Sequence, residues 1–176
     1  MSGLVLETAR LQLRRLDLDD APFVLRLVNE PSWLRFIGDR GVRTVDDARG
    51  YIRNGPLAMY ARHGFGLWLV ERKGDKRPLG QCGLLKRDGL DHPDIGFAFL
   101  PDYWGQGYAQ EAAAATLAYG HDALGMPEIQ AITSLDNEAS IKLLQRLGFG
   151  YRRQIELSPG DPVKLFAHPH NPEVSR

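Results

Sequence analysis

Two glycines with the spacing Gly-x-Gly, Gly105 and Gly107, lie between a short apolar stretch and an alanine-rich stretch. The apolar stretch, residues 94–100, has the length and aromatic content of a strand, and the stretch from Tyr108 onward favours a helix. Glycine lets main-chain N–H groups approach a ligand closely, and a helix start offers unpaired N–H groups and a positive dipole end. This combination predicts a phosphate-binding loop, although a tight connection without a ligand would use the same glycines.

Two common phosphate loops do not match these residues. A Walker loop ends in Gly-Lys-Ser or Gly-Lys-Thr, whereas Tyr108 and Ala109 follow Gly107. A dinucleotide fingerprint needs a third glycine where Gln110 stands and an acidic residue roughly 20 positions further on. The nearest such acid, Asp136, lies too far along the chain.

The segment WGQGYA, from Trp104 to Ala109, resembles the pyrophosphate loop of the GNAT superfamily of acetyl-coenzyme A-dependent N-acetyltransferases. The superfamily pattern is Arg or Gln, two residues, Gly, one residue, then Gly or Ala, and Trp104 departs from it at the first position. The flanking acid-Ile-Gly-aromatic strand and the following Tyr-Ala-x-Glu-Ala look like the RimJ/RimL-type branch, which modifies the N-termini of ribosomal proteins. The resemblance extends over about residues 6–168.

This resemblance implies an α+β fold with a mixed, mostly antiparallel central sheet flanked by helices. Its fourth and fifth strands would splay so that the arm of the co-substrate, acetyl-CoA, enters the gap. The arm would pair like an added strand with main-chain groups of Phe99 and Leu100. The pyrophosphate would bind the N–H groups of Gly105, Gln106, Gly107, Tyr108 and Ala109.

A second signature of the family is Asn137-x-x-Ser140 at a helix start. The resemblance implies that Asn137 holds the arm of the co-substrate and that Ser140 gives a proton to the departing thiolate. Helix capping by Asn137 is compatible with that role, and a first-turn serine without a catalytic role is the alternative for Ser140.

The acceptor must lose a proton before it attacks. An α-amine, with a reference pKa of about 7.7–8.0, is partly neutral near physiological pH, whereas a lysine amine near 10.4 needs more help. Asp94 stands where the resembled branch has glutamate, so it would act through a water, and Glu156 is the other candidate base. For both acids, an exposed strand end without a role is an equal alternative. The histidines at 63, 92 and 121 are predicted to be surface or loop residues.

Composition excludes several classes of protein. The 22 basic and 22 acidic residues cancel, so no strong field favours nucleic acid or an anionic membrane surface. No apolar run of about 18 residues and no secretory signal pattern appears. No cluster has metal-ligand spacing. The single cysteine, Cys82, is predicted to be a small core residue, which argues against a covalent acetyl-enzyme and suits a reducing cytoplasm.

The length predicts one domain, residues 1–176, with a core over about 6–168 and a C-terminal tail over 169–176. Helices are expected from the acids at 17–20 to Glu30, over 45–59 with Thr44 as cap, over 106–123, and from Asn137 to Gly148. In the family layout Trp33 and Phe36, between the first two helices, would form the acceptor wall. Strands are expected over 10–16, 65–71, 79–86, 94–100, 129–135, 149–156 and 163–167.

The leading prediction is therefore direct transfer of an acetyl group to a primary amine in a ternary complex. The amine would belong to a protein N-terminus or a small molecule, and a homodimer that shares sheet edges is compatible with this prediction. A non-catalytic acyl-CoA-binding module is the alternative, and a regulator that prefers a dinucleotide or nucleoside triphosphate is a third.

Overall fold

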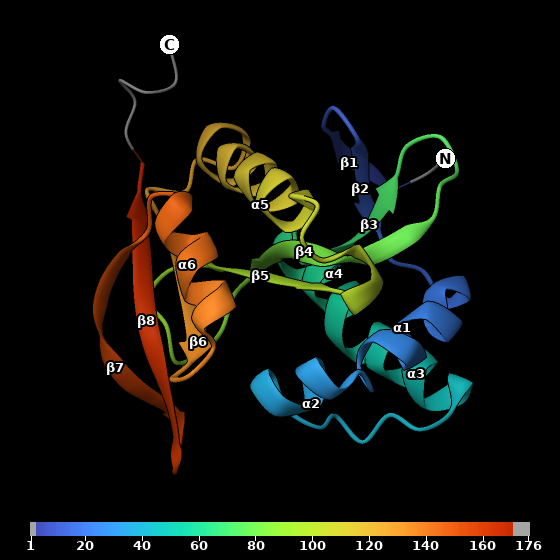
Figure 1. Ribbon diagram of the computed structural model, residues 1–176, viewed down its shortest axis with the longest axis horizontal. Helices are drawn as coiled ribbons and strands as arrows, with labels where there is room; N and C mark the ends of the chain where they lie inside the picture. The colour runs from blue at the N-terminus through green and yellow to red at the C-terminus, as the bar shows by residue number, and fades with distance from the viewer. Residues whose placement is uncertain (1–2, 171–176) are drawn as a thin grey trace.

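The computed structural model describes residues 3–170, which form an eight-stranded sheet with helices on both faces (Figure 1). The strands are β1 (Leu4–Glu7), β2 (Leu11–Arg15), β3 (Leu67–Arg72), β4 (Pro78–Leu85), β5 (Asp94–Phe99), β6 (Glu128–Ser134), β7 (Gly150–Ser158) and β8 (Asp161–Pro169). The α-helices are α1 (Ala21–Leu27), α2 (Pro31–Phe36), α3 (Val45–Ile52), α4 (Ala58–His63), α5 (Tyr108–Ala118) and α6 (Glu138–Arg146). The predicted α+β class is confirmed.

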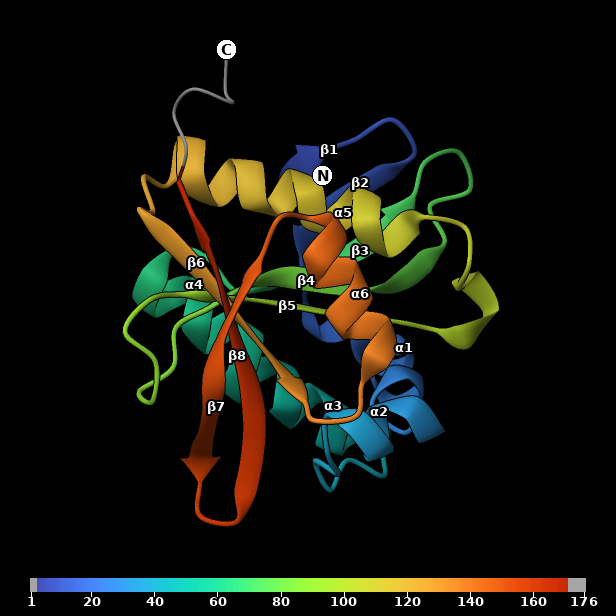
Figure 2. The ribbon, with the colours of Figure 1, turned by 60° about the vertical axis from the view of Figure 1, so that its left-hand side comes forward.

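The sheet order is β1-β2-β3-β4-β5-β6-β8-β7, and neighbouring strands are antiparallel except β5 and β6. Those two run parallel and pair at one position, between Asp94, the first residue of β5, and Gln130, the third residue of β6. Beyond that pair they separate, and Figure 2 shows β6 and β8 running steeply across β5. The predicted splay between the central strands is therefore present, and it divides the sheet into two halves.

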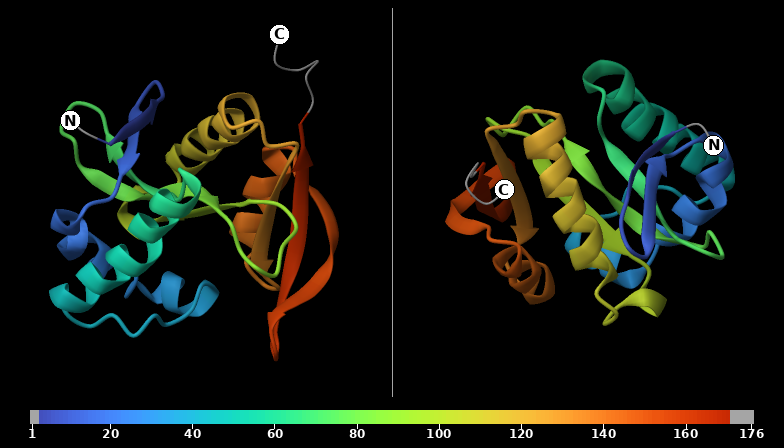
Figure 3. Two further views of the ribbon diagram at one scale, coloured as in Figure 1. Left: turned by 180° about the vertical axis from the view of Figure 1, so that it is seen from behind. Right: turned by 90° about the horizontal axis from the view of Figure 1, so that it is seen from above.

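Alternation along the strands gives the sheet two different faces. Cys82 and Leu84 of β4 point toward α5, where the Cys82 sulfur lies 3.4 Å from the Thr116 hydroxyl. Leu69 of β3 and Ala98 of β5 instead pack in the cluster formed with α1 and α3. Figure 3 shows α3 and α4 on the opposite side of the sheet from α5. The buried thiol of Cys82 confirms its prediction as a core residue.

The first helices follow local signals, with two corrections. Thr44 caps α3 in a capping box with Asp47, as predicted. The helix predicted to end at residue 59 continues instead through a wide turn, Arg53–Leu57, into α4 and ends at Gly64, whose φ is 79°. The first helix ends before Pro31, as predicted. Pro31 also begins a second short helix, α2, which was not expected.

Both chain ends hold more strand than the sequence indicates. β1 was not predicted, and it pairs with β2 despite its four-residue length. β8 includes Pro169, the first residue of the expected tail, because Pro169 pairs with Glu128. The N–H of His170 also donates to the Pro127 carbonyl at 2.8 Å. The rest of that tail lies outside the described residues. Within residues 3–170 no helix is long and apolar enough to cross a membrane.

Candidate functional site

The connection between β5 and α5 forms an open loop of main-chain donors. Gly105 and Gly107 have φ angles of 76° and 81°, the left-handed region that side chains disfavour. The first helical bond runs from the Glu111 N–H to the Gly107 carbonyl at 3.0 Å, and no side chain caps the helix. Residues 108–110 consequently have no acceptor inside α5 for their N–H groups. The loop can therefore accept an anion without displacing a protein group.

The gap that opens beyond Asp94 has a wall formed by the main chain of β5. The Leu100 N–H donates to the Leu79 carbonyl at 3.0 Å, which places Leu100, Ala98 and Gly96 in hydrogen bonds with β4. By alternation, the main-chain groups of Phe97 and Phe99 face β6. The indole N–H of Trp104 already donates to the Phe99 carbonyl at 2.9 Å. Phe97 and the Phe99 N–H remain available to an added strand.

Leu100 itself offers little main-chain bonding capacity to a ligand. Besides its N–H, its carbonyl has a partner, because it accepts from the Tyr103 N–H at 3.0 Å. Leu100 is buried and belongs to the core cluster on the α3 side. In our proposal the pairing expected for Leu100 shifts to Phe97.

The opposite wall of the gap presents polar groups from β6 and α6. The hydroxyls of Thr133 and Ser134 are buried and have no hydrogen-bond partner among the described residues, and as neighbours in β6 they point to opposite faces of the sheet. Asn137 caps α6 through its side-chain oxygen, which accepts from the Ser140 N–H at 3.3 Å. The side-chain nitrogen of Asn137 and the Ser140 hydroxyl form no hydrogen bond to another described residue. These groups suit a ligand arm that carries amides, such as pantetheine, because buried polar atoms need partners.

Asp94 lies at the closed end of the gap and is fully buried. The Arg87 Nε donates to its two carboxylate oxygens at 3.0 and 3.1 Å. Burial raises the pKa of Asp94 to about 6, against the opposing charge of Arg87. The alternative of an exposed strand-end acid is therefore wrong for Asp94. Asp94 and Ala98 lie on the same face of β5, the face turned toward α1 and α3.

Asp94 and Ser140 approach the gap from different ends. Phe99 follows Asp94 by five positions along β5, a distance of about 17 Å in an extended strand. Ser140 instead follows the far end of β6. Glu156, the other candidate base, is exposed on β7 opposite Pro162.

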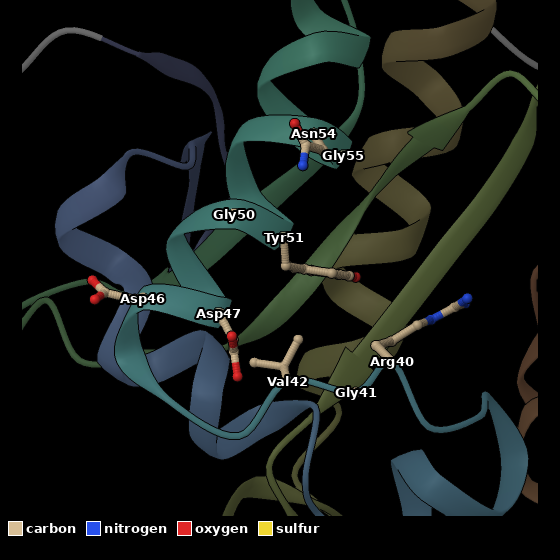
Figure 4. Close-up of a pocket in the computed structure, with 9 residues that line it drawn as sticks. All are labelled: Arg40, Gly41, Val42, Asp46, Asp47, Gly50, Tyr51, Asn54 and Gly55. Carbon is tan, nitrogen blue, oxygen red and sulfur yellow. The ribbon is translucent and has the colours of Figure 1, made fainter.

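A pocket of about 610 Å³ lies between α3 and the loop that precedes it (Figure 4). Tyr51 of α3 and Arg40 of the preceding loop extend across it in the same direction. Burial raises the pKa of Tyr51, and the charges of Arg40 and Arg87 oppose that shift, so both guanidinium groups lie near the phenol. Tyr51 thus lies within electrostatic range of Arg87, the partner of Asp94. The pocket is lined by Arg40, Gly41, Val42, Asp46, Asp47, Gly50, Tyr51, Asn54 and Gly55.

Other candidate side chains are placed less favourably. Trp33 is 5% exposed and packs in the core with α1 and α3, so the expected acceptor wall does not include its ring face. Phe36 is half-buried beneath Arg35. His121 is buried, which corrects its prediction as a surface residue; its ring contacts the Met126 carbonyl and His168. Among the described residues no group of His, Cys, Asp and Glu could hold a metal ion.

One residue at the glycine loop was not predicted from sequence. The Arg10 Nη1 donates to the Gln106 carbonyl at 3.0 Å, although 96 positions separate the two residues. Arg10 follows the turn between β1 and β2, and β1 was not predicted. Only the charge and the loop motif were visible in the sequence, and neither indicates this contact.

Comparisons with known proteins agree with this geometry. A family model described as the acetyltransferase (GNAT) domain matches residues 10–150, so the chain belongs to the GNAT acetyltransferase family. YoaA of Bacillus subtilis strain 168, described as an uncharacterized N-acetyltransferase, is 30% identical over 162 residues, which are 90% of this chain and 91% of YoaA. The protein is accordingly an N-acetyltransferase.

Two solved structures share the fold. An acetyltransferase from Agrobacterium tumefaciens strain C58 has a TM-score of 0.81 at 22% identity, over 97% of this chain and 96% of that chain. RimL, a ribosomal L7/L12 alpha-N-protein acetyltransferase in complex with coenzyme A, has a TM-score of 0.80 at 18% identity, over 94% and 97%. These likenesses support the predicted resemblance to the RimJ/RimL-type branch at the level of fold.

Proposed function

We propose that this enzyme transfers the acetyl group of acetyl-CoA directly to a primary amine in a ternary complex. The observation that carries the proposal is the run of unpaired loop donors at the mouth of the β5–β6 gap. A pyrophosphate can bind there while a thin arm extends between the strands.

In the proposed complex, the N–H groups of residues 105–109 bind the pyrophosphate. Main-chain groups of Phe97 and Phe99 pair with the arm, and the side-chain amide of Asn137 supplies a hydrogen bond from the other wall. One strand N–H directed at the thioester oxygen would stabilise the developing oxyanion, an effect typically worth about 10²–10³ in rate. Acetyl-CoA brings the activated acyl group.

Two side chains, one near each end of the gap, accept and donate the protons of the reaction. The carboxylate of Asp94 accepts the amine proton through one or more waters, because the strand separates it from Phe99. The hydroxyl of Ser140 donates a proton to the thiolate that leaves. A covalent acetyl-cysteine is disfavoured because burial raises the pKa of the Cys82 thiol to about 12, so almost no thiolate is present.

The acceptor is a protein N-terminus or a small-molecule amine that enters from the α3 side, past the pocket beside Tyr51. RimL is described as an alpha-N-protein acetyltransferase, which supports testing peptide N-termini first. The proposal includes a cytoplasmic location, since the chain's single cysteine suits a reducing compartment. It also includes one folded domain and the possibility of a homodimer.

The test is to incubate the purified protein with acetyl-CoA and separate panels of peptides with free N-termini, lysine-containing peptides with blocked N-termini, and small amines. Mass spectrometry should detect one acetyl group per acceptor, and the thiol released should match it in amount. Binding of acetyl-CoA with no acetylated product in any panel would contradict the proposal and favour the non-catalytic module.

A further inference from the structure

Arg10 contacts three consecutive residues of the glycine loop. Its Nη1 donates to the Gln106 carbonyl at 3.0 Å, and its guanidinium carbon lies 4.4 Å from the centroid of the Tyr108 ring. A Cβ built on Gly107 would lie 3.4 Å from the Arg10 Nη2. This side chain therefore lies directly against the peptide groups that the loop offers to a ligand.

Glu111, in the first turns of α5, fixes the position of Arg10. Its Oε1 accepts from the Arg10 Nε at 2.8 Å, and its Oε2 accepts from the Arg10 N–H at 3.0 Å and from the Thr8 hydroxyl at 2.5 Å. Burial favours the neutral acid, but the hydrogen bonds from Thr8 and Arg10 outweigh it and lower the pKa of Glu111. The side chain of Glu111 is thus a carboxylate that ties the β1–β2 hairpin to α5.

The contact with the Gln106 carbonyl sets the direction of the next N–H. In a planar trans peptide the C=O and N–H bonds point in opposite directions. Because Arg10 holds the Gln106 carbonyl on its own side, the Gly107 N–H must point away from Arg10. Glycine at φ 81° would otherwise let this peptide rotate easily, since it lacks a Cβ.

We propose that Arg10 is a positioning residue, which orients the Gln106–Gly107 peptide so that the Gly107 N–H faces the pyrophosphate of the co-substrate. This inference rests on the proposed function and adds a residue outside the loop motif. The ion pair with Glu111 largely cancels the charge of Arg10, so the effect depends on the orientation of the peptide and not on added positive charge.

The departure at Trp104 fits this role. The family pattern has Arg or Gln at that position, but here the indole is 55% exposed and donates to the Phe99 carbonyl. Trp104 thus supports the wall of the gap and supplies no long polar side chain to the loop. Arg10 supplies one from the β1–β2 hairpin.

The test compares two ligands, coenzyme A and pantetheine, which lacks the pyrophosphate and the nucleotide. Wild type, Arg10→Ala and Arg10→Lys are titrated with each. We expect coenzyme A to bind about tenfold or more weakly to both variants, the loss typical of a hydrogen bond to a charged group. Pantetheine should bind them as it binds wild type. Lysine keeps the charge but cannot bond Glu111 and Gln106 together through a rigid fork.

Arg77→Ala is the matched control, because Arg77 is exposed at the β3–β4 turn. It should change neither affinity. If the Arg10 variants do not fold, Glu111→Gln tests the same tie, and it should weaken coenzyme A selectively.

Each contrary result has a distinct meaning. Equal weakening of both ligands would show a general structural role and overturn the inference. Wild-type affinity in Arg10→Lys would show that charge alone matters and overturn it as well. Failure of wild type to bind coenzyme A would instead overturn the proposed function.

Discussion

Asp94 combines full burial, a single cationic partner and a place at the closed end of the gap. If its carboxylate accepts the proton of the amine, activity requires the ionised form. We expect kcat/KM of wild type to rise with pH through an apparent pKa of about 6. Asp94→Asn should abolish this rise of kcat/KM with pH and lower kcat/KM by roughly 10²-fold or more.

Asp88→Asn is the control, because Asp88 is exposed in the β4–β5 loop that precedes Asp94, and it should leave the pH profile unchanged. If kcat/KM of Asp94→Asn still rises with pH through about 6, Asp94 is not the base, and its ion pair with Arg87 has only a structural role.

The same group makes stability depend on pH. Its pKa is raised in the folded protein from 3.8 to about 6, so the folded state holds this proton more tightly than the unfolded state does. The stabilisation is fully present below about pH 4 and is lost as pH rises through about 6. Denaturant melts between these values should show a smaller decline of stability in Asp94→Asn than in wild type.

Ser140 has a hydroxyl with no described partner, next to the cap of α6. If it donates a proton to the thiolate, Ser140→Ala should lower kcat by about 10²-fold while coenzyme A affinity stays the same. Steady-state kinetics with titration of coenzyme A separate these quantities. Ser158→Ala, in the β7–β8 hairpin, should retain wild-type kcat. Full activity in Ser140→Ala would show that Ser140 is a residue of the first turn of α6 without a catalytic role.

At the scale of elements, Asn137 has two separable duties. Its oxygen caps α6, and its side-chain nitrogen is available to the arm of the co-substrate. Asn137→Asp keeps an equally good cap but removes the donor. We expect thermal stability close to that of wild type with clearly weaker binding of coenzyme A. Loss of stability without a change in affinity would limit Asn137 to capping.

The β5–α5 loop should fail selectively when its second glycine gains a side chain. Gly107→Ala places a Cβ beside Arg10 and strains a left-handed residue, and coenzyme A should bind far more weakly. Gly125→Ala has a comparable φ of 66° and open space around its Cβ, so it pays the same strain of about 1–2 kcal/mol away from the site. Equal affinities in the two variants would remove the phosphate assignment.

The elements predicted best are those fixed by neighbours in the chain. The strand, glycine loop and helix around Gly107 follow from alternation, conformational freedom and helix propensity, and Thr44 follows from capping chemistry. α2 was missed because six residues make a helix only when tertiary contacts, here the burial of Trp33, stabilise it.

The parts of the site that depend on distant contacts were not visible in the sequence. His121 reads as a polar loop residue, but His168 of β8 covers it. Arg10 reads as a strand-end charge, and only folding brings it to Gln106. The burial of Asp94 likewise depends on closure of the sheet between β4 and β6.

At the scale of the whole molecule, the parallel meeting of β5 and β6 connects the candidate groups. It closes the gap at Asp94 and opens it toward the glycine loop and α6, so one ligand can contact both halves of the sheet. Under the proposed function, the acceptor would use the α3 side, where the pocket beside Tyr51 lies. In the proposed complex, acetyl-CoA would enter from the α5 side of the sheet and the acceptor from the α3 side.

The most direct measurement is calorimetric titration of the purified protein with acetyl-CoA, with NADH and ATP as controls. The account predicts saturable binding of one acetyl-CoA per chain and clearly weaker binding of both nucleotides. Absence of acetyl-CoA binding, or preference for NADH or ATP, would contradict the assignment of the glycine loop and of the gap beside it.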